Sequence, residues 1–360
     1  MPMLVKRRKD EGTGGLKENG LGAGSKQDYF SGSQWIRLLV QVFFLAIVLW
    51  TGYRFYGFVS YYQNHQEAAM VQRPPGVEGF LPISSLMGLK YWILSGDFNT
   101  IHPAGMVLFA LFLLIALVMK KGFCGWICPI GFLSEYLWKA GRKIFGRNFM
   151  LPRWADYPLR SLKYLLMIFF VWAVITMNLS DLKAFLYGPY NKVADVKMLY
   201  FFTKMTTLTF WVLIVLMVLS LFVKNFWCRY LCPYGALLGF FSIFSPLKIT
   251  RNPETCTGCA ECSLACPSNI RVHQKQRIRS DECMSCYACV DACPEPDTLK
   301  MRMGKKSKLS LPPWAYAAII VGLFLLFTGM ARLTGHWHNS IPPTEYYQLI
   351  NNANNPDIQH

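Results

Sequence analysis

The sequence predicts an all-α membrane bundle of five transmembrane helices, with a small α+β domain inserted before the last helix. Three observations support this fold class. Of the 360 residues, 53% are hydrophobic and only 16% are charged, which is typical of integral membrane proteins rather than of soluble enzymes. Apolar stretches of membrane-spanning length recur along the chain, with basic residues beside them. Finally, eight of the twelve cysteines are concentrated in one short segment, 256–293.

The spans follow in order from the amino terminus. Residues 1–33 have too few apolar side chains to fold alone, so we expect a disordered cytoplasmic tail. The first span, about 35–55, is an anchor rather than a cleaved signal peptide, because no small-x-small cleavage site follows it. The loop 58–103 contains an apolar stretch, 83–94, of the length of an interfacial helix. The other four spans are predicted at about 101–121, 163–179, 206–223 and 314–333.

The distribution of charge orients these spans. Residues 120–163 carry nine Lys and Arg against two acidic residues, and residues 224–312 carry thirteen against seven. The loop 58–103 carries only two basic residues against three acidic ones. By the positive-inside rule, the amino terminus and the cysteine-rich segment face the cytoplasm, and the carboxyl terminus faces the outside. The net charge of +17 follows from this topology, so nucleic-acid binding is the weaker interpretation.

A short motif occurs twice in the membrane part. Cys124-x3-Cys128-Pro129 is repeated as Cys228-x3-Cys232-Pro233, 104 residues later. Each copy follows an outward and an inward span, so we expect two parallel repeats related by a pseudo-twofold axis along the membrane normal. The predicted domains are therefore the tail (1–33), a membrane domain with both repeats (34–248), the inserted domain (249–304), and the fifth helix with an external tail (305–360).

The eight clustered cysteines form two copies of a C-x2-C-x2-C-x3-C-P pattern. This pattern holds two [4Fe–4S] clusters in bacterial ferredoxins, where the fourth cysteine of each copy binds the other cluster. The sequence thus predicts a two-cluster ferredoxin-like domain. A zinc site is the alternative, but zinc motifs group their cysteines as two separated pairs. Disulfides are not expected on the reducing, cytoplasmic side. The predicted ligands are Cys256, Cys259, Cys262 and Cys293 for one cluster, and Cys283, Cys286, Cys289 and Cys266 for the other.

The four remaining cysteines are candidates for a third centre. The predicted symmetry would bring Cys124, Cys128, Cys228 and Cys232 together at the inner membrane surface. A spacing of four places both sulfurs of each motif on one face of a helical turn, and the proline ends or redirects the chain after the second cysteine. The glycine two residues after the proline allows a tight bend. A third iron–sulfur centre, a redox-active dithiol or copper site, and plain packing cysteines remain open interpretations.

With these motifs, the chain resembles the membrane polyferredoxin family, which is NapH- and YccM-like and is related to the membrane half of NosR and to CcoG. The resemblance extends from about residue 35 to the end. It implies a protein that exchanges electrons with the quinone pool and with a membrane or periplasmic redox partner, such as a c-type cytochrome or a reductase subunit. Because the flavin-binding domain of NosR has no counterpart ahead of the first span, FMN is not expected.

Electrons would have to cross a bilayer core of about 30 Å from the cytoplasmic cysteines, so we expect a diffusing quinone as the mobile link. Polar residues of the external loop are the candidate quinone site: Glu78, Lys90, Asp97 and His102. A carboxylate or imidazole there would accept the protons of quinol oxidation. One external b haem bound by His102 and His338 is a further possibility. The open alternative is that these side chains only pair or hydrogen-bond within loops.

Three functions are compatible with this sequence. The first is a membrane electron-transfer protein that connects the quinone pool to partner redox proteins, either as a conduit or with quinol-oxidising or quinone-reducing activity. The second is a copper-reducing or metal-cofactor assembly factor that uses the C-x3-C-P cysteines. The third is a redox sensor whose clusters signal to a partner.

Overall fold

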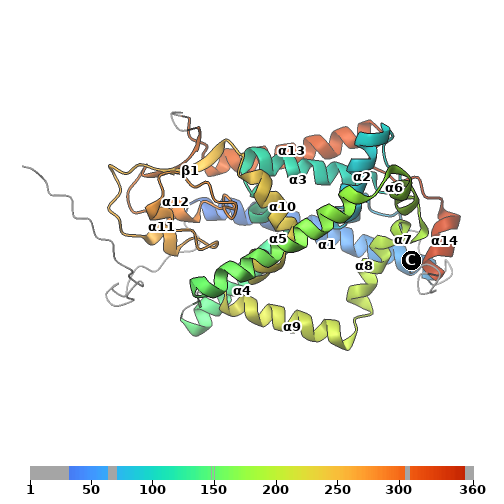
Figure 1. The fold of residues 1–360 in the computed structure, drawn as a ribbon, viewed down its shortest axis with the longest axis horizontal. Helices are drawn as coiled ribbons and strands as arrows, with labels where there is room; N and C mark the ends of the chain where they lie inside the picture. Colours follow the sequence, from blue (N-terminus) through green and yellow to red (C-terminus); the bar gives the residue numbers. More distant parts are fainter. Residues whose placement is uncertain (1–31, 64–70, 147, 150, 305–308, 353–360) are drawn as a thin grey trace, which may run out of the picture.

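The computed structural model describes residues 32–63, 71–146, 148–149, 151–304 and 309–352. Its shape is elongated, with long helices running between a small cysteine-rich lobe at one end and a group of short helices at the other (Figure 1). Of the predicted amino-terminal tail, only residues 32 and 33 are among those described.

Helices make up most of the described chain. Proline stands in the first turn of seven α-helices, where its missing N–H has no partner to lose and its fixed φ suits the helix. The α-helices are α1 (Ser33–Gln63), α2 (Pro82–Ser95), α3 (Pro103–Met119), α4 (Pro129–Phe145), α5 (Arg153–Thr176), α6 (Leu179–Leu186), α7 (Pro189–Lys192), α8 (Ala194–Thr203), α9 (Thr207–Phe222), α10 (Pro233–Ser242), α11 (Glu261–Leu264), α12 (Ala288–Asp291), α13 (Pro313–Leu333) and α14 (Pro343–Asn351). Short 3-10 helices are η1 (Pro75–Phe80) and η4 (Val272–Gln274), and π-helices are η2 (Phe123–Ile127) and η3 (Trp227–Leu231).

Three helices, α1, α5 and α13, are long and apolar enough to cross a membrane, and they overlap the predicted first, third and fifth spans. The predicted second and fourth spans correspond to α3 and α9, which have 17 and 16 residues. At 1.5 Å per residue these helices extend over only about 26 and 24 Å, less than the roughly 30 Å hydrocarbon core. α8 and α9 together are long and apolar enough to span a membrane, but the chain bends by 79° between them. They are a fourth candidate only if the bent pair is taken as one broken span. The number of five spans is therefore not confirmed.

The tightest part of the membrane bundle is formed by α1, α3 and α13. Leu111 and Ile115 of α3 and Ile320 of α13 are fully buried, and Phe44 of α1 meets Phe324 of α13 edge to face at 5.0 Å between ring centroids. By contrast, most apolar side chains of α5 and α9 are exposed. α9 runs at the edge of the molecule, apart from α1, α3 and α13, and packs on α4 (Figure 1).

The cysteine-rich lobe is closed by a two-stranded antiparallel sheet. β1 (Leu247–Arg251) pairs with β2 (Leu299–Met303), with Leu247 opposite Met303. Ile249 and Met301 face each other across the sheet and are buried with Val272 and Ile278 in a small core. The strands thus bring together the two ends of the predicted inserted domain, 249–304.

The opposite end of the molecule is a cap of short helices, consisting of η1, α2, α6, α7, α8 and α14 (Figure 1). The predicted interfacial helix at 83–94 is present as α2. It packs on α3 and α6. Residues 64–70, in the loop before η1, lie outside the described part of the chain.

Candidate metal centres

Four cysteines line a small cavity at the surface of the lobe, and we call them the distal group: Cys256, Cys259, Cys262 and Cys293. This is the predicted crosswise set, with three cysteines from the first copy of the motif and the last from the second. The sulfur of Cys256 faces the backbone N–H of Gly258 and the Arg251 side chain, which lower its pKa. Cys259 is exposed, so this group is the one nearest to solvent.

The other four cysteines of the lobe line a second cavity and form the proximal group: Cys266, Cys283, Cys286 and Cys289. Burial, followed by the nearby Cys286, raises the pKa of Cys266 to about 12, although the backbone N–H groups of Ile270 and Ser268 point at its sulfur. Burial likewise raises the pKa of Cys286 and Cys289. Such buried thiols lose their protons only to a strongly positive group. The donor set therefore suits a metal centre.

The two motif copies fold alike. Ala260 and Tyr287 each follow the second cysteine of a copy, and both have left-handed backbone conformations, with φ of 63° and 59°. Each begins a single helical turn, α11 or α12, that carries the third cysteine. A left-handed residue is costly outside glycine, and here it turns the third sulfur back toward the first two.

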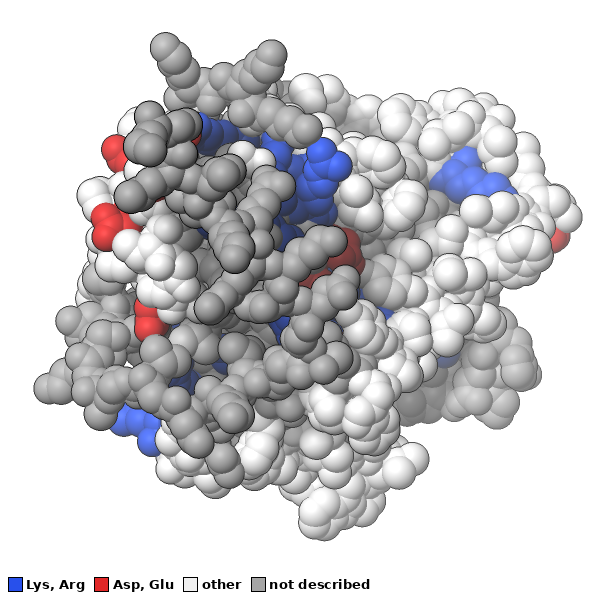
Figure 2. Space-filling model, turned by 60° about the vertical axis from the view of Figure 1, so that its left-hand side comes forward, with Lys and Arg blue, Asp and Glu red and all other residues white. Residues whose placement is uncertain are grey.

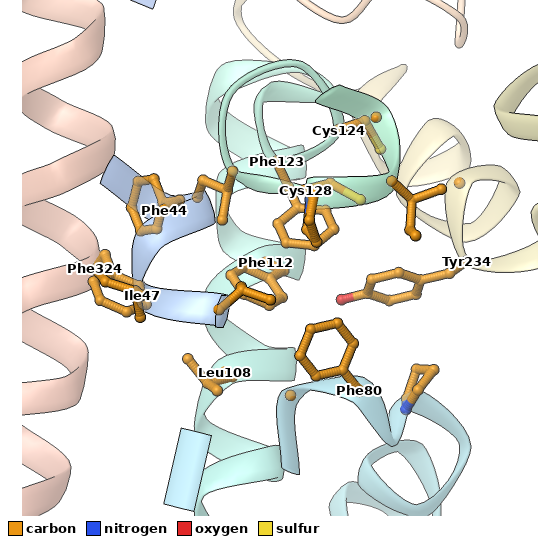
Figure 3. A pocket seen from close by; sticks show the side chains of 18 of the residues that line it. Phe44, Ile47, Phe80, Leu108, Phe112, Phe123, Cys124, Cys128, Tyr234 and Phe324 are labelled. Atoms are coloured by element: carbon orange, nitrogen blue, oxygen red, sulfur yellow. The ribbon is translucent and has the colours of Figure 1, made fainter. Parts of the chain in front are cut away.

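The third set, the membrane-edge group, lines a cavity of about 620 Å³ between the lobe and the membrane helices: Cys124, Cys128, Cys228 and Cys232. Figure 3 shows Cys124 and Cys128 at one end of this cavity, above a wall of phenylalanine side chains. The other three thiols lie near enough to Cys228 to raise its pKa, after burial as the main cause. The structure thus brings together cysteines 104 residues apart.

The local geometry of the C-x3-C-P motifs differs from the expected α-helical turn. Each motif is a π-helix, in which the N–H of the second cysteine donates to the carbonyl five residues earlier, at 2.9 Å for Cys128 and 3.1 Å for Cys232. Each π-helix ends just before the second cysteine, whose backbone is extended, and the following proline begins α4 or α10, so the chain changes direction there as predicted. Cys128 and Cys232 therefore cap these helices, and the N–H of Gly235 donates to the sulfur of Cys232 at 3.2 Å.

Gly131, two residues after Pro129, is required because a side chain there would collide with a neighbouring carbonyl group, not because the chain bends. A Cβ on Gly131 would lie 2.3 Å from the carbonyl oxygen of Cys124, closer than real Cβ contacts allow. Its backbone φ is not in the left-handed region. The expectation of a special turn at this glycine is therefore wrong, and close packing of the motif on α4 is the reason for glycine.

The proximal group is the one that faces the membrane-edge group. Pro267, Ser268 and Met284 line both cavities. A Cβ on Gly125 would lie 2.5 Å from the carbonyl oxygen of Met284, and Trp126 donates from Nε1 to the carbonyl of Ser285 at 3.0 Å. The distal group adjoins the proximal group on its other side, where Cys262 lies near Cys289. The three groups are thus arranged in series.

Buried charges connect the lobe to the membrane domain. The carboxylate of Glu282, next to Cys283, forms ion pairs with Lys163, with Lys121 at 3.6 Å and with Arg160 at 3.4 Å. Burial alone would raise the pKa of Glu282, but Lys121 and Lys163 outweigh it and lower this pKa to about 2. The same two lysines lie near the membrane-edge thiols.

The beginning of α1 joins the same two sites. Gln34 donates from Nε2 to the carbonyl of Cys286 at 3.0 Å, and Arg37 donates from Nε to the carbonyl of Gly125 at 2.9 Å. The buried guanidinium of Arg37 also pairs with Glu135 of α4. A single helix end therefore fixes the proximal loop, the first C-x3-C-P motif and α4 relative to one another.

The cysteine groups fit a cluster better than a single ion. Among the described residues, no three His, Cys, Asp or Glu side chains are arranged closely enough to hold one metal ion. Each four-sulfur group instead surrounds a cavity, and backbone N–H groups point at several of the sulfurs. Iron–sulfur clusters are held by four thiolates and tuned by such hydrogen bonds.

The four residues predicted for a quinone site do not surround one cavity. Glu78 is fully buried, pairs with Arg73 at 2.6 Å and accepts from the N–H of Gly105 at 3.0 Å. His102 is its neighbour, with Nδ1 3.7 Å from the Glu78 carboxylate. Lys90 lies elsewhere and donates to carbonyls at the end of α5, and Asp97 is exposed. None of the four lines the 620 Å³ cavity.

The two predicted haem ligands, His102 and His338, differ in burial. The Nε2 atom of His102 lies 2.7 Å from the carbonyl of Asn191, and the ring is buried. His338, in contrast, is exposed. The structure records no contact between these two histidines within its described part.

Comparison with known proteins gives the chain a family. A family model described as a 4Fe-4S binding domain matches residues 101–148 and 204–252, and one described as a 4Fe-4S dicluster domain matches residues 248–294. YccM of Escherichia coli (strain K12), named as a candidate electron transport protein, is 41% identical over 92% of this chain and 94% of its own length. The chain belongs to the NapH/YccM-like membrane polyferredoxins.

More distant polyferredoxins share parts of the chain. NapH of Escherichia coli (strain K12), named a ferredoxin-type protein, is 24% identical over 81% of this chain and 95% of its own length. NosR of Pseudomonas aeruginosa, named a regulatory protein, is 30% identical over 52% of this chain but only 25% of its own length. No solved structure matches the chain. The dicluster model covers all eight lobe cysteines of this polyferredoxin, and the binding-domain model covers one C-x3-C-P motif in each of its two matches.

Sequence reasoning missed one role of the basic residues in this polyferredoxin. Lys120 donates from Nζ to the carbonyl of Ser280 at 3.0 Å, and Lys224 donates to the carbonyl of Leu264 at 2.9 Å. These lysines hold the lobe, whereas the sequence explained them only as positive-inside charges. A signal was present, because Lys120 and Lys224 are separated by the same 104 residues as the two motifs.

Proposed function

We propose that the chain is an iron–sulfur electron-transfer protein of the bacterial inner membrane that connects the quinone pool to partner redox proteins. The distal and proximal groups would each hold a [4Fe–4S] cluster, and the membrane-edge group would hold a third centre. Such clusters supply one-electron carriers. The two matches of a 4Fe-4S binding domain to the C-x3-C-P regions support an iron–sulfur identity for the third centre.

The serial arrangement of the cysteine groups supports a relay. The exposed Cys259 places the distal group where a soluble redox partner has access. The shared wall of Pro267, Ser268 and Met284 places the proximal group against the membrane-edge group. In this proposal, electrons pass between solvent and membrane in the order distal, proximal, membrane-edge. The partner at the distal group would then be a soluble redox protein of the cytoplasm. A c-type cytochrome or a reductase subunit on the membrane or periplasmic side, proposed by analogy with the family, would be reached through the quinone.

The observation that carries the quinone proposal is the 620 Å³ cavity itself. It is bordered by the membrane-edge cysteines at one end and reaches Gly76 and Gly79 of η1 at the other. Its walls are mainly apolar, and the hydroxyl of Tyr234 projects into it toward Phe112 (Figure 3). An apolar pocket with few polar groups is the usual form of a site for a small organic cofactor. A quinone ring bound there would meet the last cysteine group directly.

The cavity revises the residues proposed for quinone binding. Tyr234, which can donate a hydrogen bond to a quinone oxygen, replaces the four loop residues as the first candidate. Glu78 precedes Gly79, which lines the cavity, so this residue lies just behind the cavity wall. With His102, it remains a candidate to accept protons that a bound quinol releases. Tyr234 was overlooked because the equivalent residue of the first repeat is Ile130.

The proposed topology places the lobe in the cytoplasm and α14 in the periplasm. The lobe and α14 lie at opposite ends of the long helices (Figure 1). The basic segments 120–163 and 224–312 belong to the lobe end, as the positive-inside rule requires for the cytoplasmic side.

Filling the cavity tests the function. Ile47 of α1 lines the cavity, and the exposed Leu49 of the same helix does not. We expect Ile47→Trp to slow reduction of the clusters by a quinol analogue at least tenfold, whereas Leu49→Trp leaves the rate unchanged. Visible absorbance and EPR after mixing give the rates. Equal rates in both variants would exclude the cavity, and stoichiometric copper at the membrane-edge group in purified protein would favour the assembly-factor alternative.

A further inference from the structure

Basic side chains gather where the lobe meets the membrane helices. Lys248 of β1 and Arg302 of β2 are cross-strand partners, and Arg277 forms an isolated bridge with β1. With Arg279 they form what we call the basic corner: Lys248, Arg277, Arg279 and Arg302. Arg302 also pairs with Ser310, just before α13 begins, and β1 follows closely after α10. The basic corner therefore lies at the level where these helices enter the lobe.

The basic corner has no acidic side chain at ion-pair distance in the part of the chain that the structure describes. Burial and the neighbouring Arg277 and Arg279 lower the pKa of Lys248, which reports the closeness of like charges. Lys120, at the end of α3, also lies within range of Lys248 and Arg277. Within the described residues, no side chain of the basic corner forms an ion pair. Such a group is destabilising unless an anion binds to it.

The hydrogen bonds of the corner are also incomplete. Lys248 donates from Nζ to the carbonyl of Ile243 at 2.8 Å, and Arg277 donates from Nη2 to the carbonyl of Pro246 at 2.6 Å. The Nε atoms of Arg277 and Arg302 are buried and have no hydrogen-bond partner among the described residues. Guanidinium groups with free N–H donors suit the oxygens of a phosphate group, which they bind in a planar, paired fashion.

Exposed apolar side chains adjoin the basic corner. Phe240, Ile243 and Phe244, at the end of α10, are among the exposed large hydrophobic residues, and the two phenylalanine rings meet edge to face at 5.8 Å. Ile243 is also the residue whose carbonyl binds Lys248. Figure 2, which turns the lobe toward the viewer, shows Lys and Arg side chains gathered on the lobe beside the largely uncharged surface of the helices.

We propose that the basic corner binds the phosphate group of an anionic phospholipid in the leaflet that adjoins the lobe. The exposed Phe240, Ile243 and Phe244 would contact the acyl chains, while the arginines bind the headgroup. Basic sites between membrane helices on the cytoplasmic side recognise lipid headgroups in this way. The apolar neighbours favour a lipid over free phosphate, which would gain nothing from them.

Bound lipid would hold the lobe on the membrane domain from a second side. The corner is formed by β1, which follows α10, by β2, which precedes α13, and by the segment of Arg277 and Arg279, so a headgroup there joins all of these parts. This proposal depends on the membrane location of the chain but not on the quinone site.

The test uses the purified full-length protein with its clusters in neutral detergent. Short-chain phosphatidylglycerol, short-chain phosphatidylcholine or inorganic phosphate is added, and thermal unfolding is followed by visible absorbance. The variant is Arg277→Gln/Arg279→Gln. The matched control is Arg271→Gln/Lys275→Gln, which removes two exposed cations from the same lobe outside the corner.

Phosphatidylglycerol is expected to raise the unfolding temperature of the wild type and the control at concentrations where the other two additives do not. The corner variant should need about thirtyfold more of this lipid, from the loss of two basic residues near the headgroup. If that variant does not retain its clusters, Arg279→Gln alone, at an exposed position, should need about fivefold more. An unchanged response in the variant, or an equal response to inorganic phosphate, would overturn the lipid site.

Discussion

Replacing Glu282 by glutamine removes the only carboxylate that we find bound to both Lys121 and Lys163 in the described chain. In the folded protein the pKa of Glu282 falls from 4.5 to about 2 because these lysines outweigh its burial. A decrease of this size corresponds to roughly 3 kcal/mol in favour of the charged form in the folded state. The folded pKa is the lower one, so this contribution is present above about pH 4.5 and is lost as the pH falls toward 2.

Glu282→Gln should therefore destabilise the docked lobe by about 3 kcal/mol at neutral pH, within the range known for breaking a buried ion pair. Denaturant titration in detergent, followed by the visible absorbance of the clusters, measures the loss. Glu254→Gln is the control, since Glu254 is an exposed acidic residue of the same lobe. If both variants unfold at the same denaturant concentration, the buried charge network does not hold the lobe.

Three more predictions follow from the site and the cap. Cys128→Ser should remove the spectroscopic signals of the membrane-edge centre and leave those of the lobe; EPR with all signals retained would refute the third centre. Gly131→Ala should disrupt the same centre, because its Cβ would lie 2.3 Å from the carbonyl oxygen of Cys124, whereas Gly322→Ala, with no atom within 4 Å, should not; iron content checks both. Lys90→Met should leave carbonyls at the end of α5 unpaired and cost about 1–3 kcal/mol in the same unfolding assay.

The lobe was largely predictable because its ligands are close in sequence. The cysteine spacing of the double motif predicts the crosswise sets, and the structure groups the same eight sulfurs around two cavities. The C-x3-C-P motifs were predictable as a pair but not in their geometry. A spacing of four is compatible with an α-turn or a π-turn, and only the structure, through the hydrogen bonds from Cys128 to Phe123 and from Cys232 to Trp227, shows that both are π-turns.

The candidate quinone site stays a prediction, and the structure separates the residues that the sequence suggested for it. Polar residues in an apolar loop, such as Glu78 and Lys90, suggested a site, but their partners are Arg73 and the end of α5. Hydropathy cannot reveal a cavity, because a cavity is defined by side chains from several helices at once. Hydropathy also could not give the number of spans, since it does not show that the chain bends by 79° between the apolar helices α8 and α9.

The sequence by itself predicted the family, which the comparisons confirm, and it predicted membrane helices and the cysteine groups, because each depends on composition or on short, regular spacings. The tertiary structure alone decided that the proximal group faces the membrane-edge group, that Tyr234 rather than the loop carboxylates enters the cavity, and that Lys120 and Lys224 hold the lobe. These are contacts between residues far apart in the chain. They depend on how helices and loops pack in three dimensions, which local patterns in one sequence do not encode.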